Sequence, residues 1–438
     1  MNLAFWLWLI FYLAVGFLGW RQADARLRPL VAVYLGFYFV TTYIGTVMIG
    51  LTDGEVLYDW GASIEVSELG ELNRPSFWIL LVLPLLVPFL AQACRRFAQT
   101  MHLSLSTRAE QLLEPSVPSW ALLLAFLSLA LAVFAALAAL GEVGTVLASG
   151  RSDALALIES RGEQASRVPG PFYGLLFITL PMLSFALLWN AARGDRLRDW
   201  AMFIFSALVV LILDMLTLQK SILILYLMLV IMAMLQLRVI LLKTASLLVG
   251  LPVAILYLIQ SAVFDDWNLE MTLNLIFLRM ASSFPFYYGL YPSPGGEDIP
   301  LTRFVYQVMY YGRYKLAGLE GNCPASSHVT AYYQGGLFGA TLCVLAISVC
   351  LAALARFRDY RGPLGFGVFM QTLVAAYYWT QTSFREPIYS PYGIVMVVPG
   401  VALAWLIVNR GAFLRGRAAD GGKARSNPGP APPAPPPA

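Results

Sequence analysis

Long apolar runs recur along most of this chain and are separated by short polar segments. Most of the runs approach or exceed the roughly 20 residues that a helix needs to cross the hydrocarbon core of a bilayer. The pattern predicts an all-α polytopic membrane protein with about eleven transmembrane helices, and about twelve at most. The predicted helices are Leu3–Trp20, Pro29–Gly50, Ser76–Ala93, Ser119–Leu140, Pro171–Asn190, Trp200–Leu218, Ser221–Leu237, Thr244–Ala262, Val329–Ala355, Leu364–Gln381 and Ile388–Val408.

Composition excludes an ordinary soluble protein. Hydrophobic residues make up 59% of the chain and charged residues only 12%, whereas about a quarter of a soluble domain is charged. The first run is not expected to be a cleaved signal, because no basic residue precedes it. A single membrane domain is predicted over residues 1–415, followed by a disordered, proline-rich tail over residues 416–438. The four cysteines fall at different predicted depths, which excludes a disulfide framework.

The charges predict the orientation of the helices. Alternate loops, around residues 21–28, 95–110, 193–199, 238–243 and 356–361, carry most of the Lys and Arg residues and few of the acids, and the C-terminal tail is also basic. Basic loops of a membrane protein stay in the cytoplasm. The N-terminus and the loops 51–75, 141–170 and 263–328 are therefore predicted to lie outside, and the C-terminal tail inside.

This alternation constrains the longest outer segment. Thr272–Tyr291 is apolar enough to suggest a further crossing, but a second crossing would then be needed before His328. The only candidate, Leu301–Leu319, carries three basic side chains. We therefore interpret Thr272–Tyr291 as a re-entrant or surface-lying helix within a large outer loop of short helices.

Arginines on the outer side are candidates for anion binding, because the positive-inside rule disfavours them there. Arg151 and Arg161 lie in the loop 141–170, while Arg279, Arg303 and Arg313 lie in the large loop. The guanidinium group presents a planar fork of donors that suits phosphate. Pairing with nearby acids, or contact with lipid headgroups, is the alternative for each of them.

A lysine and an acidic pair on the outer side each allow two interpretations. Lys220 flanks a tight outer turn together with Asp214; the two could pair with each other, or Lys220 could contact a substrate. Asp53 and Glu55 form an acidic pair in the first outer loop. Such a pair is explained by solvation, but it is also similar to the metal-binding or basic pair of membrane glycosyltransferases of the dolichol-phosphate-sugar type.

Candidate catalytic groups lie at two places near the C-terminal helices. His328 is expected to face outward and could act as a base; no second histidine lies nearby, so no zinc site is expected. Arg385 and Glu386 precede the last helix, either as a surface ion pair or as part of a site. The many tyrosines of the large loop suit both a membrane-interface belt and stacking on sugar rings.

The segment Pro324–Gly339 resembles the Wzy-type oligosaccharide repeat-unit polymerases. In that family a Pro/Ser-rich outer loop runs into a helix with a Tyr followed by Gly-x-x-Gly, and Pro324, Ser326, Tyr332 and Gly336-x-x-Gly339 match this pattern. The Gly-Glu pair that often precedes the Tyr is replaced here by Val329-Thr330. Agreement extends to Arg151, to the basic residue at Lys220, where the family usually has Arg, and to Arg385-Glu386.

The resemblance implies a membrane glycosyltransferase of the GT-C structural class that works without a metal or other cofactor. Its expected substrate is an oligosaccharide repeat unit linked to undecaprenyl pyrophosphate, and its expected place is the bacterial inner membrane with the site facing the periplasm. A flippase and a chain-length regulator are expected partners; nucleic acid is not. The pyrophosphate or glycan would contact Arg151, Arg161, Lys220, Arg279, Arg303, Arg313 and Tyr332, while Arg385, Glu386 and His328 would be catalytic.

Three alternatives differ in what they do with the lipid-linked glycan. O-antigen ligases share the architecture and a His-containing outer loop, but their glycines come about one helical turn later. A polyprenyl-phosphate-sugar transferase would centre on Asp53 and Glu55. A transporter or flippase would be expected to show internal repeats and charges within several helices, and this chain shows neither.

Overall fold

The computed structural model describes residues 3–52, 74–101, 112–139, 169–194, 196–216, 220–241, 325–390 and 393–409. It also describes the short pieces 243–245 and 281–289 and the single residues 250, 254, 257, 277 and 291. Every regular element in these ranges is a helix.

The N-terminal part of the bundle consists of three apolar helices, two of them interrupted. Pro84 and Pro88 have no backbone N–H to donate within a helix, and a short 3-10 turn forms between them. A wide π turn interrupts the second helix, as such turns often do near functional sites. The elements are α1 (Leu3–Gln22), α2 (Arg28–Tyr38), η1 (Phe39–Tyr43), α3 (Ile44–Leu51), α4 (Pro75–Val82), η3 (Leu83–Leu86) and α5 (Val87–Thr100).

The rest of the chain adds a second group of helices and the C-terminal elements. The second group contains α7 (Ser119–Ala139), α10 (Gly170–Gly174), η4 (Leu175–Thr179), α11 (Leu180–Gly194), α12 (Leu197–Leu216) and α13 (Lys220–Gln236). The C-terminal elements are α16 (Ser283–Gly289), α18 (Ser327–Leu354), η6 (Ala355–Asp359), α19 (Pro363–Tyr378), α20 (Glu386–Tyr389) and η7 (Ile394–Val397). Helix continues from η7 over residues 398–409.

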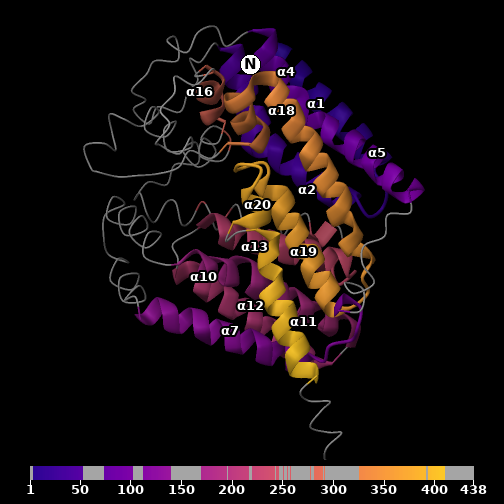
Figure 1. The fold of residues 1–438 in the computed structure, drawn as a ribbon, viewed down its shortest axis with the longest axis vertical. Helices are drawn as coiled ribbons and strands as arrows, with labels where there is room; N and C mark the ends of the chain where they lie inside the picture. Colours follow the sequence, from indigo (N-terminus) through magenta and orange to yellow (C-terminus); the bar gives the residue numbers. More distant parts are fainter. Residues whose placement is uncertain are drawn as a thin grey trace, which may run out of the picture.

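Helix α19 forms the centre of the molecule. All of its residues from Pro363 to Ala376 are buried, and it lies between α2 on one side and α11 on the other (Figure 1). Helix α18 packs along α5, and α16 packs on α18. A helix buried all round is expected to be apolar all round, and α19 has this composition apart from the buried Gln371 and Thr372.

The structure confirms a polytopic helical membrane protein, but not the number of crossings. Among the described residues, 8 helices are long and apolar enough to cross a membrane, and each coincides with a predicted helix. Two further predicted helices appear as α13 and α19, which are shorter, with 17 and 16 residues. The predicted helix Thr244–Ala262 lies almost entirely outside the described residues.

Residues 281–288, the longest described part of the predicted segment Thr272–Tyr291, lie inside the molecule, whereas Tyr291 is 39% exposed. Helix α16 has 7 residues, and those from Ser283 to Tyr288 are all buried. A surface-lying helix would leave one face exposed to the headgroup region, so this alternative does not fit residues 283–288. The re-entrant alternative remains a prediction.

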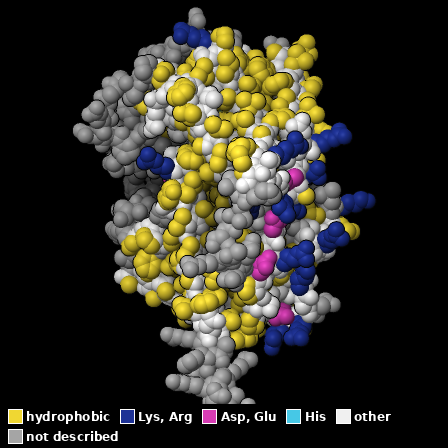
Figure 2. Space-filling view, turned by 45° about the vertical axis from the view of Figure 1, so that its right-hand side comes forward, with side chains coloured by type: hydrophobic (Ala, Val, Ile, Leu, Met, Phe, Trp, Pro, Cys, Tyr) yellow, Lys and Arg dark blue, Asp and Glu magenta, His cyan; other side chains and the backbone are white. Residues whose placement is uncertain are grey.

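One edge of the bundle carries most of the described charges, and Figure 2 shows Lys and Arg side chains gathered there with a few acids among them. The ends of α1, α5 and α11, the starts of α2 and α12, and the 3-10 helix η6 supply these residues. Two ion pairs connect the segment between α1 and α2 to two other segments. Asp24 pairs with the buried Arg95 of α5, and Arg26 pairs with Asp359 of η6. The Asp24 carboxylate also accepts the backbone N–H groups of Arg26 and Leu27.

Replacement of Asp24 by asparagine is expected to destabilise the bundle. Asparagine can keep the two backbone hydrogen bonds, but it leaves the Arg95 guanidinium, which is 4% exposed, without its counter-charge. Leaving a buried charge unpaired costs on the order of 2 kcal/mol or more. We expect the midpoint of thermal unfolding in detergent micelles to fall.

Asp359→Asn is the comparison variant, because its ion-pair partner Arg26 is 47% exposed and its carboxylate acts on Arg95 only from a distance, without an ion pair among the described residues. Exposed ion pairs contribute at most about 1 kcal/mol, so the unfolding midpoint should barely change. Equal effects of the two substitutions would contradict a special role for the Asp24–Arg95 pair.

Candidate functional site

The start of α18 is joined to the end of α19 by hydrogen bonds from two serines. The Ser326 hydroxyl donates to the Thr380 carbonyl at 3.1 Å, and the Ser327 hydroxyl donates to the Thr382 carbonyl at 2.6 Å. Both serines are buried. The Pro/Ser-rich segment noted in the sequence is therefore fixed against the segment that leads to Arg385.

Helix α2 contributes to the same cluster through the π turn η1. The Thr42 and Ser326 hydroxyls lie 3.2 Å apart, and the Gln381 amide donates to the Thr41 hydroxyl at 2.9 Å. A π turn is wider than an α turn, and here two consecutive threonines reach the same neighbours. Three segments that are distant in sequence therefore meet in one cluster of hydroxyl and amide groups at the end of the bundle opposite the arginines.

His328 follows the two serines and is completely buried, with an exposed fraction of 0%. Its ring centre lies 5.5 Å from that of Tyr38 and 6.4 Å from that of Phe284. The imidazole faces the Leu80 carbonyl, whose usual helical donor is missing because residue 84 is proline. The geometry falls short of a hydrogen bond at either ring nitrogen.

The sequence analysis expected an imidazole that faces outward, and the structure instead encloses it between aromatic rings. A substrate would reach His328 only if Tyr38 or Phe284 moved. Its role as a base stays a prediction.

Arg385 and Glu386 are exposed at the edge of the cluster. Arg385 is the residue before α20, and Glu386 is its first residue. The Glu386 carboxylate interacts with the side chains of Thr382 and Ser383, and Thr382 is the residue that receives the Ser327 hydroxyl. No ion pair joins Arg385 to Glu386 in the part of the chain that the structure describes, so neither side chain is occupied by the other.

Tyr332 lies one turn beyond His328, within a cluster of tyrosines. Its ring stacks on Tyr288 with centres 5.5 Å apart and meets Tyr291 at 5.0 Å. The Tyr288 hydroxyl in turn lies 2.5 Å from the Ser76 hydroxyl of α4. Tyr332 is only 7% exposed, whereas Tyr291 is 39% exposed. Tyr291 is therefore the open ring of the cluster, and Tyr332 supports it.

The Gly-x-x-Gly part of the motif forms a kink in α18. Gly336 has φ +60° and ψ −156°, a conformation that is almost restricted to glycine. A Cβ atom at this position would lie 2.8 Å from the Tyr291 hydroxyl, and one at Gly339 would lie 2.5 Å from the Ala331 carbonyl oxygen. Both glycines are therefore required by close contacts that the kink creates.

The side chains of the other predicted site residues are not among those that the structure describes. Helix α13 begins at Lys220, but the lysine side chain is not described. The following predicted residues lie outside the described part of the chain: Asp53, Glu55, Arg151, Arg161, Arg279, Arg303 and Arg313. Of the predicted set, the structure thus brings together His328, Tyr332, Arg385 and Glu386, all around the start of α18.

Sequence reasoning missed the hydroxyl and amide groups that connect these residues, chiefly Thr41, Thr42 and Gln381. Two signals could have found them. Thr41 and Thr42 are adjacent polar residues inside an apolar run, and the polar run Thr380–Ser383 directly precedes Arg385. Polar groups at membrane depth usually face the protein interior and need partners there.

Within the described residues, no group of three or more His, Cys, Asp or Glu side chains is arranged to hold a metal ion. No family model, no curated protein and no solved structure matches the chain.

Proposed function

We propose that this protein polymerises lipid-linked oligosaccharide repeat units on the periplasmic side of a bacterial inner membrane, for O-antigen, capsule or exopolysaccharide synthesis. The observation that carries the proposal is the contact between Ser327 and Thr382. It joins the segment that resembles the polymerase motif to the turn that bears Arg385 and Glu386. Two segments that carry the resemblance, and that are distant in the sequence, are thus in contact.

The proposed reaction transfers a growing glycan from undecaprenyl pyrophosphate to a sugar hydroxyl of a new lipid-linked repeat. The hydroxyl oxygen forms a bond to the anomeric carbon, and the bond from that carbon to the pyrophosphate oxygen breaks. Lipid pyrophosphate leaves with the electron pair, and a base takes the hydroxyl proton. The chemistry therefore needs cations at the leaving group and a carboxylate or imidazole at the acceptor.

The exposed pair at the start of α20 suits these two needs. The Arg385 guanidinium can form a bidentate contact with a phosphate, and the Glu386 carboxylate can accept the proton, since neither is occupied by the other. Cations can stabilise the leaving pyrophosphate without a metal. Further contacts to pyrophosphate or glycan are proposed for Arg151, Arg161, Lys220, Arg279, Arg303 and Arg313, and Tyr291 and Tyr332 offer a platform for a sugar ring.

The distribution of charge supports the proposed orientation. The arginine-rich edge would face the cytoplasm under the positive-inside rule, together with the C-terminal tail. The cluster around Ser326 lies at the opposite ends of the helices and would face the periplasm. Proposed partners there are the lipid-linked oligosaccharide and the bilayer, with a flippase that supplies repeats and a chain-length regulator.

An O-antigen ligase remains the second candidate, because it shares the lipid-linked donor. Its likeness to this chain rests on His328, and the complete burial of that side chain favours the polymerase. A polyprenyl-phosphate-sugar transferase would depend on a metal, and EDTA would then inhibit the activity.

Mass spectrometry of undecaprenyl-linked glycans in a strain that lacks this protein tests the proposal. We expect single repeat units to accumulate on the carrier, because their addition to the growing chain has stopped. Long polymers stranded on the carrier would instead identify a ligase, and incomplete repeats would identify a transferase that adds one sugar. An unchanged glycan profile would overturn the whole proposal.

A further inference from the structure

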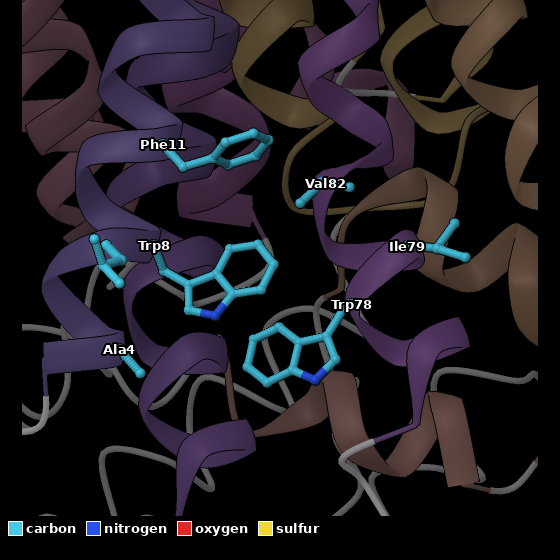
Figure 3. A pocket seen from close by; sticks show the side chains of 7 residues that line it. Ala4, Trp8, Phe11, Trp78, Ile79 and Val82 are labelled. Atoms are coloured by element: carbon cyan, nitrogen blue, oxygen red, sulfur yellow. The ribbon is translucent and has the colours of Figure 1, made fainter.

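An apolar groove of about 460 Å³ lies between α1 and α4 (Figure 3). Trp8 and Trp78 lie side by side within it, with Phe11 and Val82 on one side of the pair and Ala4 on the other. The lining side chains are all apolar: Ala4, Leu7, Trp8, Phe11, Trp78, Ile79 and Val82.

The groove exists because α1 lies close to η3 and α5 but makes few close backbone contacts with α4. Near the basic edge, Gly19 lies so close to α5 that a Cβ atom there would be 2.6 Å from the Pro88 ring. Toward the other end, the contact between α1 and α4 includes the stacked indoles of Trp8 and Trp78, whose ring centres are 4.7 Å apart. The distance between α1 and the segment α4–η3–α5 therefore increases from Gly19 toward the end that carries the candidate site.

The groove is open to the surroundings of the protein. Leu7, Phe11 and Ile79 remain 57%, 43% and 48% exposed, and they belong to two of the helices that are apolar enough to span a membrane. At this depth of a bilayer the surroundings are hydrocarbon rather than water. The groove therefore suits a hydrocarbon chain.

Both walls of the groove are connected to the candidate site through a single layer of side chains. On α1, the Trp8 carbonyl accepts a hydrogen bond from the Tyr43 hydroxyl of η1 at 3.1 Å. On α4, Phe77 precedes Trp78 and packs against Tyr288, with ring centres 5.3 Å apart. The first turn of α4 thus presents one side to the groove and the other side to the tyrosine cluster.

We propose that the groove binds the isoprenoid chain of the lipid-linked substrate whose pyrophosphate lies in the site near Arg385. This inference rests on the proposed function. A lipid held by its headgroup in the site must lead its chain into the bilayer, and the first turn of α4, which forms one wall of the groove, also packs against the tyrosine cluster of the site. The tether raises the local concentration of that chain above that of ordinary lipid chains, so the substrate's own chain is the occupant.

Photocrosslinking with an undecaprenyl pyrophosphate that carries a diazirine on its chain tests the inference. The probe is added to the full-length protein in nanodiscs of phosphatidylethanolamine and phosphatidylglycerol, and the labelled residues are mapped by peptide mass spectrometry. We expect labels within residues 4–11 and 78–82. Excess unlabelled undecaprenyl pyrophosphate should remove them, whereas additional phosphatidylglycerol should not.

A substitution that fills the groove provides the second measurement. Leu7→Trp is expected to lower labelling at these positions by about tenfold, which corresponds to about 1.4 kcal/mol of binding free energy. Leu18→Trp is the matched control, since Leu18 is a similarly exposed leucine of α1, at 51%, that does not line the groove. Labelling of this variant should equal that of the unmodified protein.

Three results would overturn the inference: labelling at other helices, displacement of the label by phosphatidylglycerol, or equal labelling of the two tryptophan variants. Displacement by phosphatidylglycerol would identify the occupant as a bulk phospholipid chain. These results are independent of the glycan profile of the deletion strain, so failure of the groove and failure of the polymerase proposal can be told apart.

Discussion

Replacement of Arg385 by alanine is expected to reduce glycan polymerisation by about 100-fold or more, because loss of one preorganised donor to a developing charge has an effect of this size. Arg385 is exposed beside the hydroxyl cluster and has no ion-pair partner among the described residues. Its removal should therefore cost little folding stability. The measurement is the ratio of long glycan to single repeat units on the carrier when the variant is expressed in the deletion strain.

Two further variants make the Arg385 result specific. Arg385→Lys keeps the charge but loses the bidentate fork, and we expect partial recovery of long glycan. Arg96→Ala removes an exposed arginine at the opposite edge of the bundle and should behave as the unmodified protein. Wild-type glycan lengths from Arg385→Ala, at equal protein level in the membrane, would remove Arg385 from the site.

Replacement of Gly336 by alanine is the second change with a large expected effect. Any side chain at φ +60° and ψ −156° is strained by on the order of 1–3 kcal/mol, and the added Cβ would also contact the Tyr291 hydroxyl. The kink would straighten or Tyr291 would be displaced, and either change disturbs the tyrosine cluster on Tyr332. We expect a lower midpoint of thermal unfolding together with loss of long glycan.

The neighbouring glycine provides the control for this change. Gly335 has φ −140°, and a Cβ atom there would meet nothing within 4 Å. Gly335→Ala should therefore be neutral for both unfolding and polymerisation. If Gly335→Ala and Gly336→Ala had the same effect, flexibility of the whole segment would matter rather than the conformation of Gly336.

The two serines of the motif have a structural task that is separate from the chemistry. Buried carbonyl groups at the end of a helix lack an intrahelical donor and need partners elsewhere in the protein. The Ser327 backbone N–H donates to the Trp379 carbonyl at 3.0 Å, and the serine hydroxyls bond the Thr380 and Thr382 carbonyls. The start of α18 therefore satisfies the end of α19, and this contact positions the turn with Arg385 and Glu386.

The sequence by itself determined where most of the helices lie and which of their ends share an edge. The predicted helices Leu3–Trp20 and Val329–Ala355 became Leu3–Gln22 and Ser327–Leu354. Such agreement is possible because a bilayer leaves the backbone no partner except itself, so the length of an apolar run defines a helix locally. Basic loops likewise mark one side through their own composition.

Only the tertiary structure decided which apolar faces are buried and which residues meet. Helices α1 and α19 are both strongly apolar, yet α1 is mostly exposed and α19 is enclosed. In a membrane the lipid is as apolar as the core, so hydrophobic periodicity does not tell the two apart. The burial of His328, the kink at Gly336 and the contact of Thr42 with Ser326 depend on packing between helices distant in the sequence, and no local pattern encodes them.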